Sequence, residues 1–190
     1  ENEGPAALDM FWREVDQLRD LFKFEFFYAP TEEFHRQIRE ELERYHEGWE
    51  TILSQGAAGF GQMLDSMTPL VSHVTLLTYA EAYSVVAALV AGMAPTESLE
   101  EADCISRALK YGRQAYLQRR ISSESSIGKL LFKNGFKMLQ SRQLTEGGDP
   151  AIAERRMDLS RELRDLLRRL DVIRAIGVAT RGANQGEANV

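Results

Sequence analysis

The sequence predicts an all-α fold, a compact domain of about six helices around an apolar central helix, with a flexible C-terminal tail. Apolar residues recur at helical spacing along most of the chain, and no stretch requires a strand. The 190 residues are 44% hydrophobic, which is enough to bury one core. We therefore assign residues 1–176 to the helical domain and residues 177–190 to the tail.

Two helices are expected before residue 49. The first carries an apolar stripe from Leu8 to Phe26, and Pro30 ends or turns it. Thr31 is the expected N-cap of the second helix, because two glutamates follow it where the helix dipole favours negative charge. The buried face of this second helix is then Phe34, Ile38, Leu42 and Tyr45.

The third segment, residues 49–68, reads as a loop with at most a short helical turn. Three glycines, Gly56, Gly59 and Gly61, interrupt any long helix there. Pro69 suits the first position of the next helix, which covers residues 70–93 and is the most apolar stretch of the chain. Its length would allow a membrane span, but a charge such as Glu81 is costly in hydrocarbon, so we expect a buried core helix and no transmembrane helix.

Residues 98–142 read as a pair of helices, and this pair carries the candidate binding residues. Ser98 and Glu101 have the spacing of a capping box at the start of the pair. Ser122 and Ser123 offer N-cap hydroxyls for the second helix, with Glu124 in its first turn.

This pair is strongly basic. Residues 107–142 hold nine lysines or arginines and one acid. Three of the lysines are spaced four apart, so they form a row beside the apolar stripe. We predict that the pair docks onto a phosphate, a lipid headgroup or an acidic partner through Arg119, Arg120, Lys129, Lys133 and Lys137.

The last helix is expected over residues 151–176, and its apolar residues are Ile152, Leu159, Leu163, Leu166, Leu167, Leu170 and Ile173. Gly147 and Gly148 mark the loop before it, and Asp149 and Pro150 suit its cap and its first turn. Residues 177–190 are small and polar, which favours a loose tail.

The net charge of −6 hides an asymmetry between the two halves of the chain. Residues 1–103 hold 20 acids and 6 bases, whereas residues 104–190 hold 9 acids and 17 bases. Either the halves fold together and neutralise each other, or the basic half meets a phosphate-bearing partner such as lipid headgroups, acyl-CoA, acyl carrier protein or nucleic acid. The single cysteine excludes an internal disulfide and suits a reducing compartment.

The chain shows no reaction centre of its own. It has no phosphate-binding glycine loop and no serine-hydrolase elbow, and Cys104 fits small core packing better than a nucleophile. His46 and Glu50 could share a metal, but no second cluster completes the site, so we expect no metal and no cofactor. His73 is expected to be a buried, hydrogen-bonded histidine, and aromatic residues near the bases fit core packing rather than nucleic-acid binding.

Three segments resemble the C-terminal domain of bacterial membrane-bound glycerol-3-phosphate acyltransferases, and the first suggests the actinobacterial branch. The most specific is similar to the family pattern GRQxLLQxRIxSxESVSKxLF. Two departures stand out: Leu77–Ala80 replaces the family's arginine and proline, and Ser126–Gly128 stands where valine and serine are usual. The matching segments are Leu21–Tyr28 with Thr31–Phe34, Tyr79–Ala87, and Gly112–Ile121 with Ser123–Ser125 and Leu131–Phe132.

The resemblance implies a non-catalytic domain that braces a catalytic domain in cis. The family's catalytic His-x4-Asp motif is missing here, because Glu40, Thr51 and Thr78 stand five residues after the three histidines. The implied reaction joins an acyl thioester and sn-glycerol 3-phosphate into 1-acyl-glycerol 3-phosphate. Further implied partners are an anionic membrane surface, acyl-CoA or acyl carrier protein, without nucleic acid.

The implied location is peripheral, on the cytoplasmic face of the cell membrane. Because the chain does not begin with Met, a piece of a longer protein is expected. The alternative is a free-standing helical ligand-binding or regulatory module, with the apolar helix of residues 70–93 lining a pocket.

Overall fold

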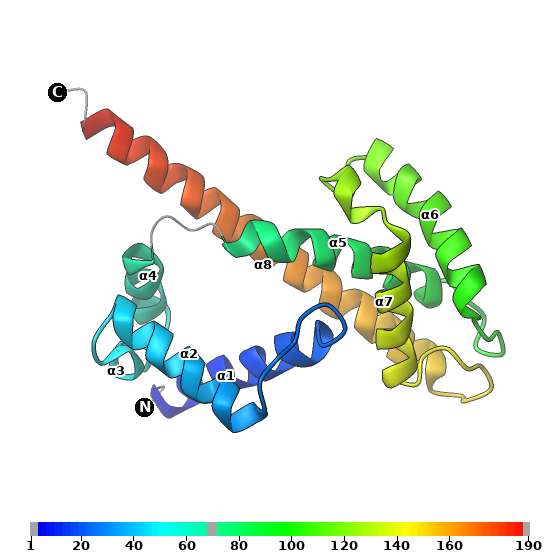
Figure 1. Cartoon of the computed structure of the whole chain (residues 1–190), viewed down its shortest axis with the longest axis horizontal. Helices are drawn as coiled ribbons and strands as arrows, with labels where there is room; N and C mark the ends of the chain where they lie inside the picture. Colours follow the sequence, from blue (N-terminus) through cyan, green and yellow to red (C-terminus); the bar gives the residue numbers. More distant parts are fainter. Residues whose placement is uncertain (1–3, 68–71, 188–190) are drawn as a thin grey trace. The chain divides into compact units, whose positions relative to one another are not determined.

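The computed structural model describes residues 4–67 and 72–187 (Figure 1). These residues form eight α-helices and one short 3-10 helix, with no strand among them, which confirms the all-α prediction. By their internal contacts the residues divide into two compact units. Unit 1 comprises Glu1–Leu70 and Ile176–Val190, and unit 2 comprises Val71–Ala175.

Besides the C-terminal part of the last helix, unit 1 contains four complete helices, which share a small aromatic core. They are α1 (Gly4–Leu21), α2 (Thr31–Tyr45), α3 (Trp49–Leu53) and α4 (Ala57–Ser66). Trp49 is buried at the centre, and Trp12 packs against the same cluster from α1. The other buried members of the cluster are Leu42, Ile52, Leu53 and Met63.

The segment between α2 and the central helix is helical, so the predicted loop at residues 49–68 is wrong. The two extra helices, α3 and α4, also account for the difference from the expected six. Gly56, with φ 69°, does break the chain between them, in a conformation that favours glycine. Gly59 has another role: a Cβ there would lie 1.8 Å from the carbonyl oxygen of Ile52, so only glycine allows α4 to approach α3 this closely.

The first helix is shorter than its apolar stripe predicts, and a turn connects it to α2. The first helix ends at Leu21 instead of continuing to Phe26, and the chain then turns around the buried Phe22. Arg19 holds the far side of this turn by donating from Nη2 to the carbonyl oxygen of Ala29 at 2.9 Å. Thr31 is not the N-cap of α2, since Pro30 occupies that position and makes no side-chain capping bond.

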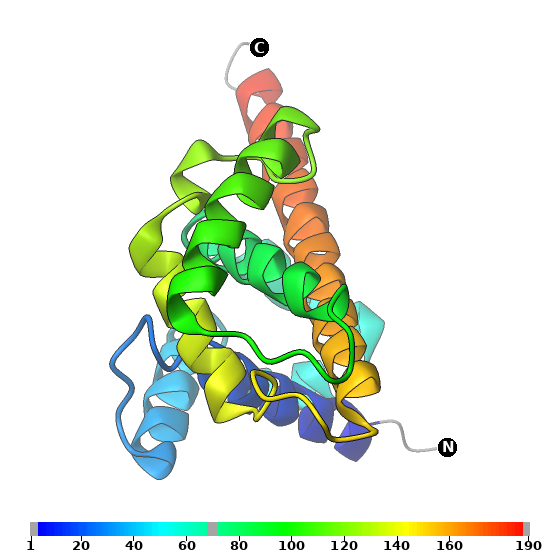
Figure 2. The ribbon, with the colours of Figure 1, turned by 90° about the vertical axis from the view of Figure 1, so that its right-hand side faces the viewer.

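Unit 2 is built around α5 (Ser72–Ala91), the predicted apolar central helix. α5 packs against α6 (Glu101–Leu117) and α7 (Lys129–Ser141), and the 3-10 helix η1 (Glu124–Ser126) also contacts it. Figure 2 shows α6 in front of α5, with α7 beside it. Pro69, predicted to begin the central helix, lies outside the described residues.

Burial around α5 extends to most of its circumference in its second half. The buried residues are Ala80, Glu81, Ala82, Tyr83, Val85, Val86, Ala87 and Val90. By length and composition, His73–Ala91 is the one helix among the described residues that could cross a membrane, with a mean hydropathy of 1.6 and 44% of the window buried. Its packing against α6 and α7 is that of a core helix.

The last helix, α8, is longer than the sequence predicts. It runs from Ile152 to Glu187 instead of ending near Ile176, because no proline follows Pro150 to stop it. Its unit 2 portion buries the predicted apolar residues Ile152, Leu159, Leu163, Leu166 and Leu170.

Arg156 of α8 is fully buried and fastens the helix to two loops of unit 2. Its guanidinium donates to three backbone carbonyl oxygens, those of Leu144 at 2.9 Å, Ala94 at 3.2 Å and Glu97 at 3.0 Å. Burial lowers the pKa of this side chain from its usual value. The role of this arginine is structural, because its guanidinium donors are used in bonds to backbone carbonyls.

Two predicted helix starts differ from the structure. The N-cap of α6 is Glu100, without a side-chain bond, so Ser98 and Glu101 do not form a capping box. Ser98 instead accepts a hydrogen bond from the amide of Gly147 at 3.0 Å. Asp149 does accept from the amide of Ala151 at 2.9 Å, but Pro150 precedes the helix rather than beginning it.

Candidate functional site

A buried carboxylate, Glu81 of α5, anchors the connection between α6 and α7. It is only 3% exposed. Its Oε1 accepts from the amide of Ser122 at 2.5 Å, and its Oε2 accepts from the hydroxyl of Ser126 at 2.6 Å. A weaker bond comes from the amide of Ser123 at 3.3 Å. One side chain therefore satisfies the buried hydroxyl of Ser126 and two partly buried amides.

Two local features of the sequence shape the connection that Glu81 binds. α6 ends where Arg119 adopts a left-handed conformation with φ 57°, which turns the chain sharply. The Ser123 hydroxyl then accepts from the amide of Ser125 at 3.2 Å and caps η1. The turn and the cap direct successive amides toward α5, where Glu81 receives them. The predicted serine cap of the second helix is wrong, because α7 begins only at Lys129 and its N-cap is Gly128.

The Glu81 anchor positions the chain and offers no obvious chemistry. Both of its oxygens are committed to donors from the connection, and the residue is closed to solvent. Sequence reasoning recognised Glu81 only as a charge within an apolar helix. Its partners lie 41 to 45 residues further along the chain, so only the packing of α5 against η1 brings them together.

The five basic residues predicted to bind an anion fall into different environments. Arg119 and Lys129 are exposed and make no described ion pair. Arg120 covers the ring of Tyr111, with 4.9 Å from its guanidinium carbon to the ring centroid, and donates to the phenolic oxygen at 2.7 Å. Lys133 pairs with Glu101 at 3.4 Å, and Lys137 is half-buried.

The predicted row of lysines does share one face of α7. Lys129, Lys133 and Lys137 are four residues apart within the helix, and the apolar residues Phe132, Phe136 and Leu139 are buried on another face. The pairing of Lys133 with Glu101 reduces the free positive charge of this row. Arg119 and Lys129 are therefore the members of the predicted set best suited to an external anion.

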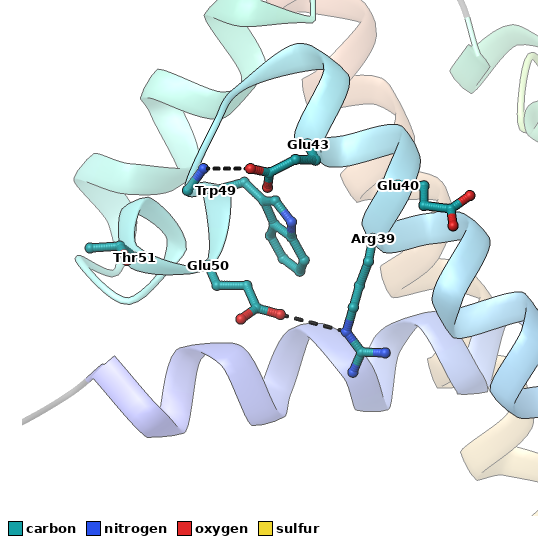
Figure 3. Close-up of a pocket in the computed structure, with 7 residues that line it drawn as sticks. Arg39, Glu40, Glu43, Trp49, Glu50 and Thr51 are labelled. Atoms are coloured by element: carbon teal, nitrogen blue, oxygen red, sulfur yellow. Dashed lines mark hydrogen bonds and ion pairs between the residues drawn. The ribbon is translucent and has the colours of Figure 1, made fainter.

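An open pocket of about 370 Å³ lies in unit 1, between α2 and α3 (Figure 3). Glu40, Glu43 and Glu50 line it together with Arg39, whose Nε lies 3.6 Å from an oxygen of Glu50. The same guanidinium sits over the ring of Trp12, 4.5 Å from its centroid. With three carboxylates against one partly engaged arginine, this pocket disfavours a phosphate ligand.

No metal-binding cluster of three or more His, Cys, Asp or Glu residues occurs in the part of the chain that the structure describes. His46 contacts the carbonyl oxygen of Glu47 and the amide of Gln62 rather than Glu50. His73 is buried as predicted, but its Nδ1 has no hydrogen-bond partner. Burial raises the pKa of the Cys104 thiol to about 11, which makes it a poor nucleophile.

The chain matches a protein-family profile over residues 2–147, and the profile describes the glycerol-3-phosphate acyltransferase C-terminal region. The chain belongs to this family. The match contains the Glu81 anchor and all of α6 and α7, and it ends before α8 begins at Ile152. Membership confirms the resemblance found in the sequence.

Curated relatives of this acyltransferase C-terminal region come from mycobacteria. The acyltransferases named plsB1 of Mycobacterium bovis and Mycobacterium tuberculosis are each 31% identical to it over 161 residues. The alignment covers 84% of this chain and 26% of each relative, so the chain spans about a quarter of their length. No solved structure shows a significant match.

Proposed function

We propose that this chain is the non-catalytic helical region of a glycerol-3-phosphate acyltransferase and that it braces a catalytic domain in cis. The observation that carries the proposal is the family match over residues 2–147. The reaction, as implied by the family, transfers an acyl group from an acyl thioester to sn-glycerol 3-phosphate and gives 1-acyl-glycerol 3-phosphate.

The chemistry of the described residues supports a bracing role. The buried ionisable groups Glu81 and Arg156 are both committed to backbone atoms of neighbouring segments. Such groups fix the positions of helices and loops, so neither Glu81 nor Arg156 is available as an acid or a base for a substrate. The pocket between α2 and α3 also has three glutamates against one arginine, an excess of negative charge that disfavours sn-glycerol 3-phosphate.

The same proposal includes an anionic partner for the basic residues of α6, α7 and their connection. An anionic membrane surface, acyl-CoA and acyl carrier protein all carry the phosphate or carboxylate groups that arginine and lysine bind. Arg119 and Lys129 are the residues we propose for this contact, with Arg120, Lys133 and Lys137 as neighbouring charge. The corresponding location is peripheral, on the cytoplasmic face of the membrane.

The bracing proposal is tested by assaying acyl transfer in three samples. These are the 190-residue chain alone, the full-length protein encoded by the gene, and the full-length protein with this region deleted. We expect product only from the full-length protein. Acyl transfer by the isolated chain at a rate comparable to the full-length protein would reject the proposal, as would undiminished activity after deletion.

The alternative of a free-standing ligand-binding module gains no support from the structure. It requires the central helix to line a pocket, whereas α5 is packed against α6, α7 and η1. The pocket described above is lined by α2, α3 and the turn between them.

A further inference from the structure

Two leucines are exposed where α6 meets the connection to α7. Leu117, the last residue of α6, is 80% exposed, and Leu130, the second residue of α7, is 69% exposed. Tyr116 beside them is 38% exposed. Because residues 118–128 connect α6 to α7 and the two helices pack together, Leu117 and Leu130 both lie next to the ends of this connection. A single exposed leucine is common on protein surfaces. These two leucines stand out because lysine and arginine residues surround them in the sequence.

The surface around these leucines carries more bases than acids, although the exposed Glu124 lies in the connection between them. Residues 104–123 contain five lysines or arginines and no aspartate or glutamate. On α6, Lys110, Arg113 and Leu117 follow each other at helical spacing, on the side opposite the buried Cys104 and Ala108. Arg113, Arg119 and Lys129 are exposed and form no ion pair with the described residues.

Some exposed arginines elsewhere in the structure are neutralised by a nearby acid. Arg161 and Arg168 of α8 each pair with an aspartate three residues earlier, Asp158 and Asp165. The bases next to the exposed leucines differ from these two arginines, because they have no ion pair among the described residues. We call the surface around the two leucines the α6–α7 tip and define it as Arg113, Leu117, Arg119, Lys129 and Leu130.

We propose that the α6–α7 tip binds an anionic lipid surface, with Leu117 and Leu130 entering the headgroup layer and the three bases contacting lipid phosphates. The choice of partner rests on the proposed function, since an enzyme that makes a phospholipid precursor works beside such a surface. The tip itself goes beyond the predicted set of basic residues, because Arg113, Leu117 and Leu130 were not part of it.

The composition of the tip favours a lipid surface over a protein partner. A stable protein interface buries about 1,600 Å² and has an apolar core. Two leucines at a helix end, ringed by bases, offer little of that core. A bilayer accepts small insertions, because every apolar group that enters contributes independently and every base adds attraction to the anionic surface.

The proposal is tested by sedimenting the 190-residue chain with vesicles of phosphatidylcholine alone or of equal parts phosphatidylcholine and phosphatidylglycerol. Two double variants alter the tip: Arg113→Glu with Arg119→Glu, and Leu117→Ser with Leu130→Ser. Matched controls on α8 are Arg161→Glu with Arg168→Glu, and Met157→Ser with Val172→Ser, since all four are exposed. Circular dichroism verifies that each variant is folded.

We expect the chain to prefer the anionic vesicles. The charge variant at the tip should bind on the order of 30-fold more weakly, because each base near an anionic surface adds about fivefold. The leucine variant should bind roughly tenfold more weakly, because the inserted methylene groups are lost. Both α8 controls should bind like the unaltered chain, and added salt should weaken the binding.

Three results would overturn the proposal. They are equal binding to both vesicle types or to neither, binding by either tip variant that equals that of its control, and binding to purified acyl carrier protein in place of vesicles. The vesicle assay contains no catalytic domain and measures no acyl transfer. Failure of the lipid contact therefore leaves the bracing role intact, and failure of the bracing role leaves the vesicle result intact.

Discussion

At the scale of single residues, the loss of Glu81 should destabilise unit 2. Glu81→Ala leaves the buried hydroxyl of Ser126 and the partly buried amides of Ser122 and Ser123 without their acceptor, so we expect a loss of about 3 kcal/mol in the free energy of unfolding. Glu81→Gln keeps one acceptor oxygen and should cost less. Ser126→Ala, which removes one donor, should cost about 1 kcal/mol. Urea denaturation followed by circular dichroism measures the series, and equal midpoints for all three variants would contradict the anchor.

Cys104 gives a second prediction at this scale, concerning pH. Its pKa is raised from 9.0 to about 11 by burial, so the folded state retains the thiol proton that the unfolded state releases. The stabilisation is complete below pH 9.0 and is lost as the pH rises toward 11. We therefore expect the stability of the chain to fall more steeply in this window than that of Cys104→Ala. Parallel pH profiles for the two proteins would be evidence against the shift.

At the scale of elements, the contact of α3 with α4 depends on one glycine. Gly59→Ala would place a Cβ 1.8 Å from the Ile52 carbonyl oxygen, so α3 and α4 must separate. We expect unit 1 to lose about 2–3 kcal/mol of stability. Gly61→Ala is the matched control in the same helix, with no atom within 4 Å of its new Cβ. It should be neutral or stabilising by up to about 1 kcal/mol.

Tryptophan fluorescence measures this pair of variants selectively. The chain has two tryptophans, Trp12 and Trp49, and both pack in the unit 1 cluster next to α3. Loss of α3–α4 packing should shift the emission of Gly59→Ala to longer wavelength and lower its denaturation midpoint. If Gly61→Ala behaved like Gly59→Ala, helix propensity rather than close approach would govern the segment.

At the scale of the whole molecule, a bracing domain should protect the activity of the full-length protein against heat. Destabilising unit 2 through Glu81→Ala should shorten the half-life of acyl-transfer activity at elevated temperature. The KM for sn-glycerol 3-phosphate at low temperature should stay unchanged, because Glu81 lies in the scaffold. Half-lives of the unaltered protein, Glu81→Ala and the exposed control Arg161→Met give the comparison. A raised KM with an unchanged half-life would assign Glu81 to substrate binding instead.

The charge asymmetry also belongs to the whole molecule. Among the described ion pairs, Arg107 with Glu97 and Lys133 with Glu101 join the acidic half of the chain to the basic half. Others stay within one half, as Arg36 does with Glu33 and Arg142 does with Glu162. Local pairing thus neutralises some bases, but it leaves the α6–α7 tip charged.

Helical periodicity was a reliable guide to the large elements. It located the central helix, the basic helix pair and the buried leucines of α8, because each of these depends on a repeated apolar face. Glycine was misleading in residues 49–68, because a glycine needed for close approach looks the same in sequence as one that breaks a helix.

Contacts between distant residues explain the remaining differences. Ser98 has the sequence of a cap but bonds to Gly147, 49 residues away. The face carrying Lys129, Lys133 and Lys137 followed from helical spacing, whereas the pairing of Lys133 with Glu101 did not. The partners of Glu81 and the exposure of Leu117 and Leu130 likewise required the packed helices.

The connection held by Glu81 has a consequence for proteolysis. It contains Arg119 and Arg120, two exposed trypsin sites, yet their amides are bound within the turn and the following Ile121 is buried. Trypsin needs an extended, locally opened segment, so cleavage there should track the opening of the connection away from α5. A brief digestion followed by mass spectrometry should find these bonds resistant in the unaltered chain and cut early in Glu81→Ala. The same carboxylate that positions the turn would then also hide it from proteases.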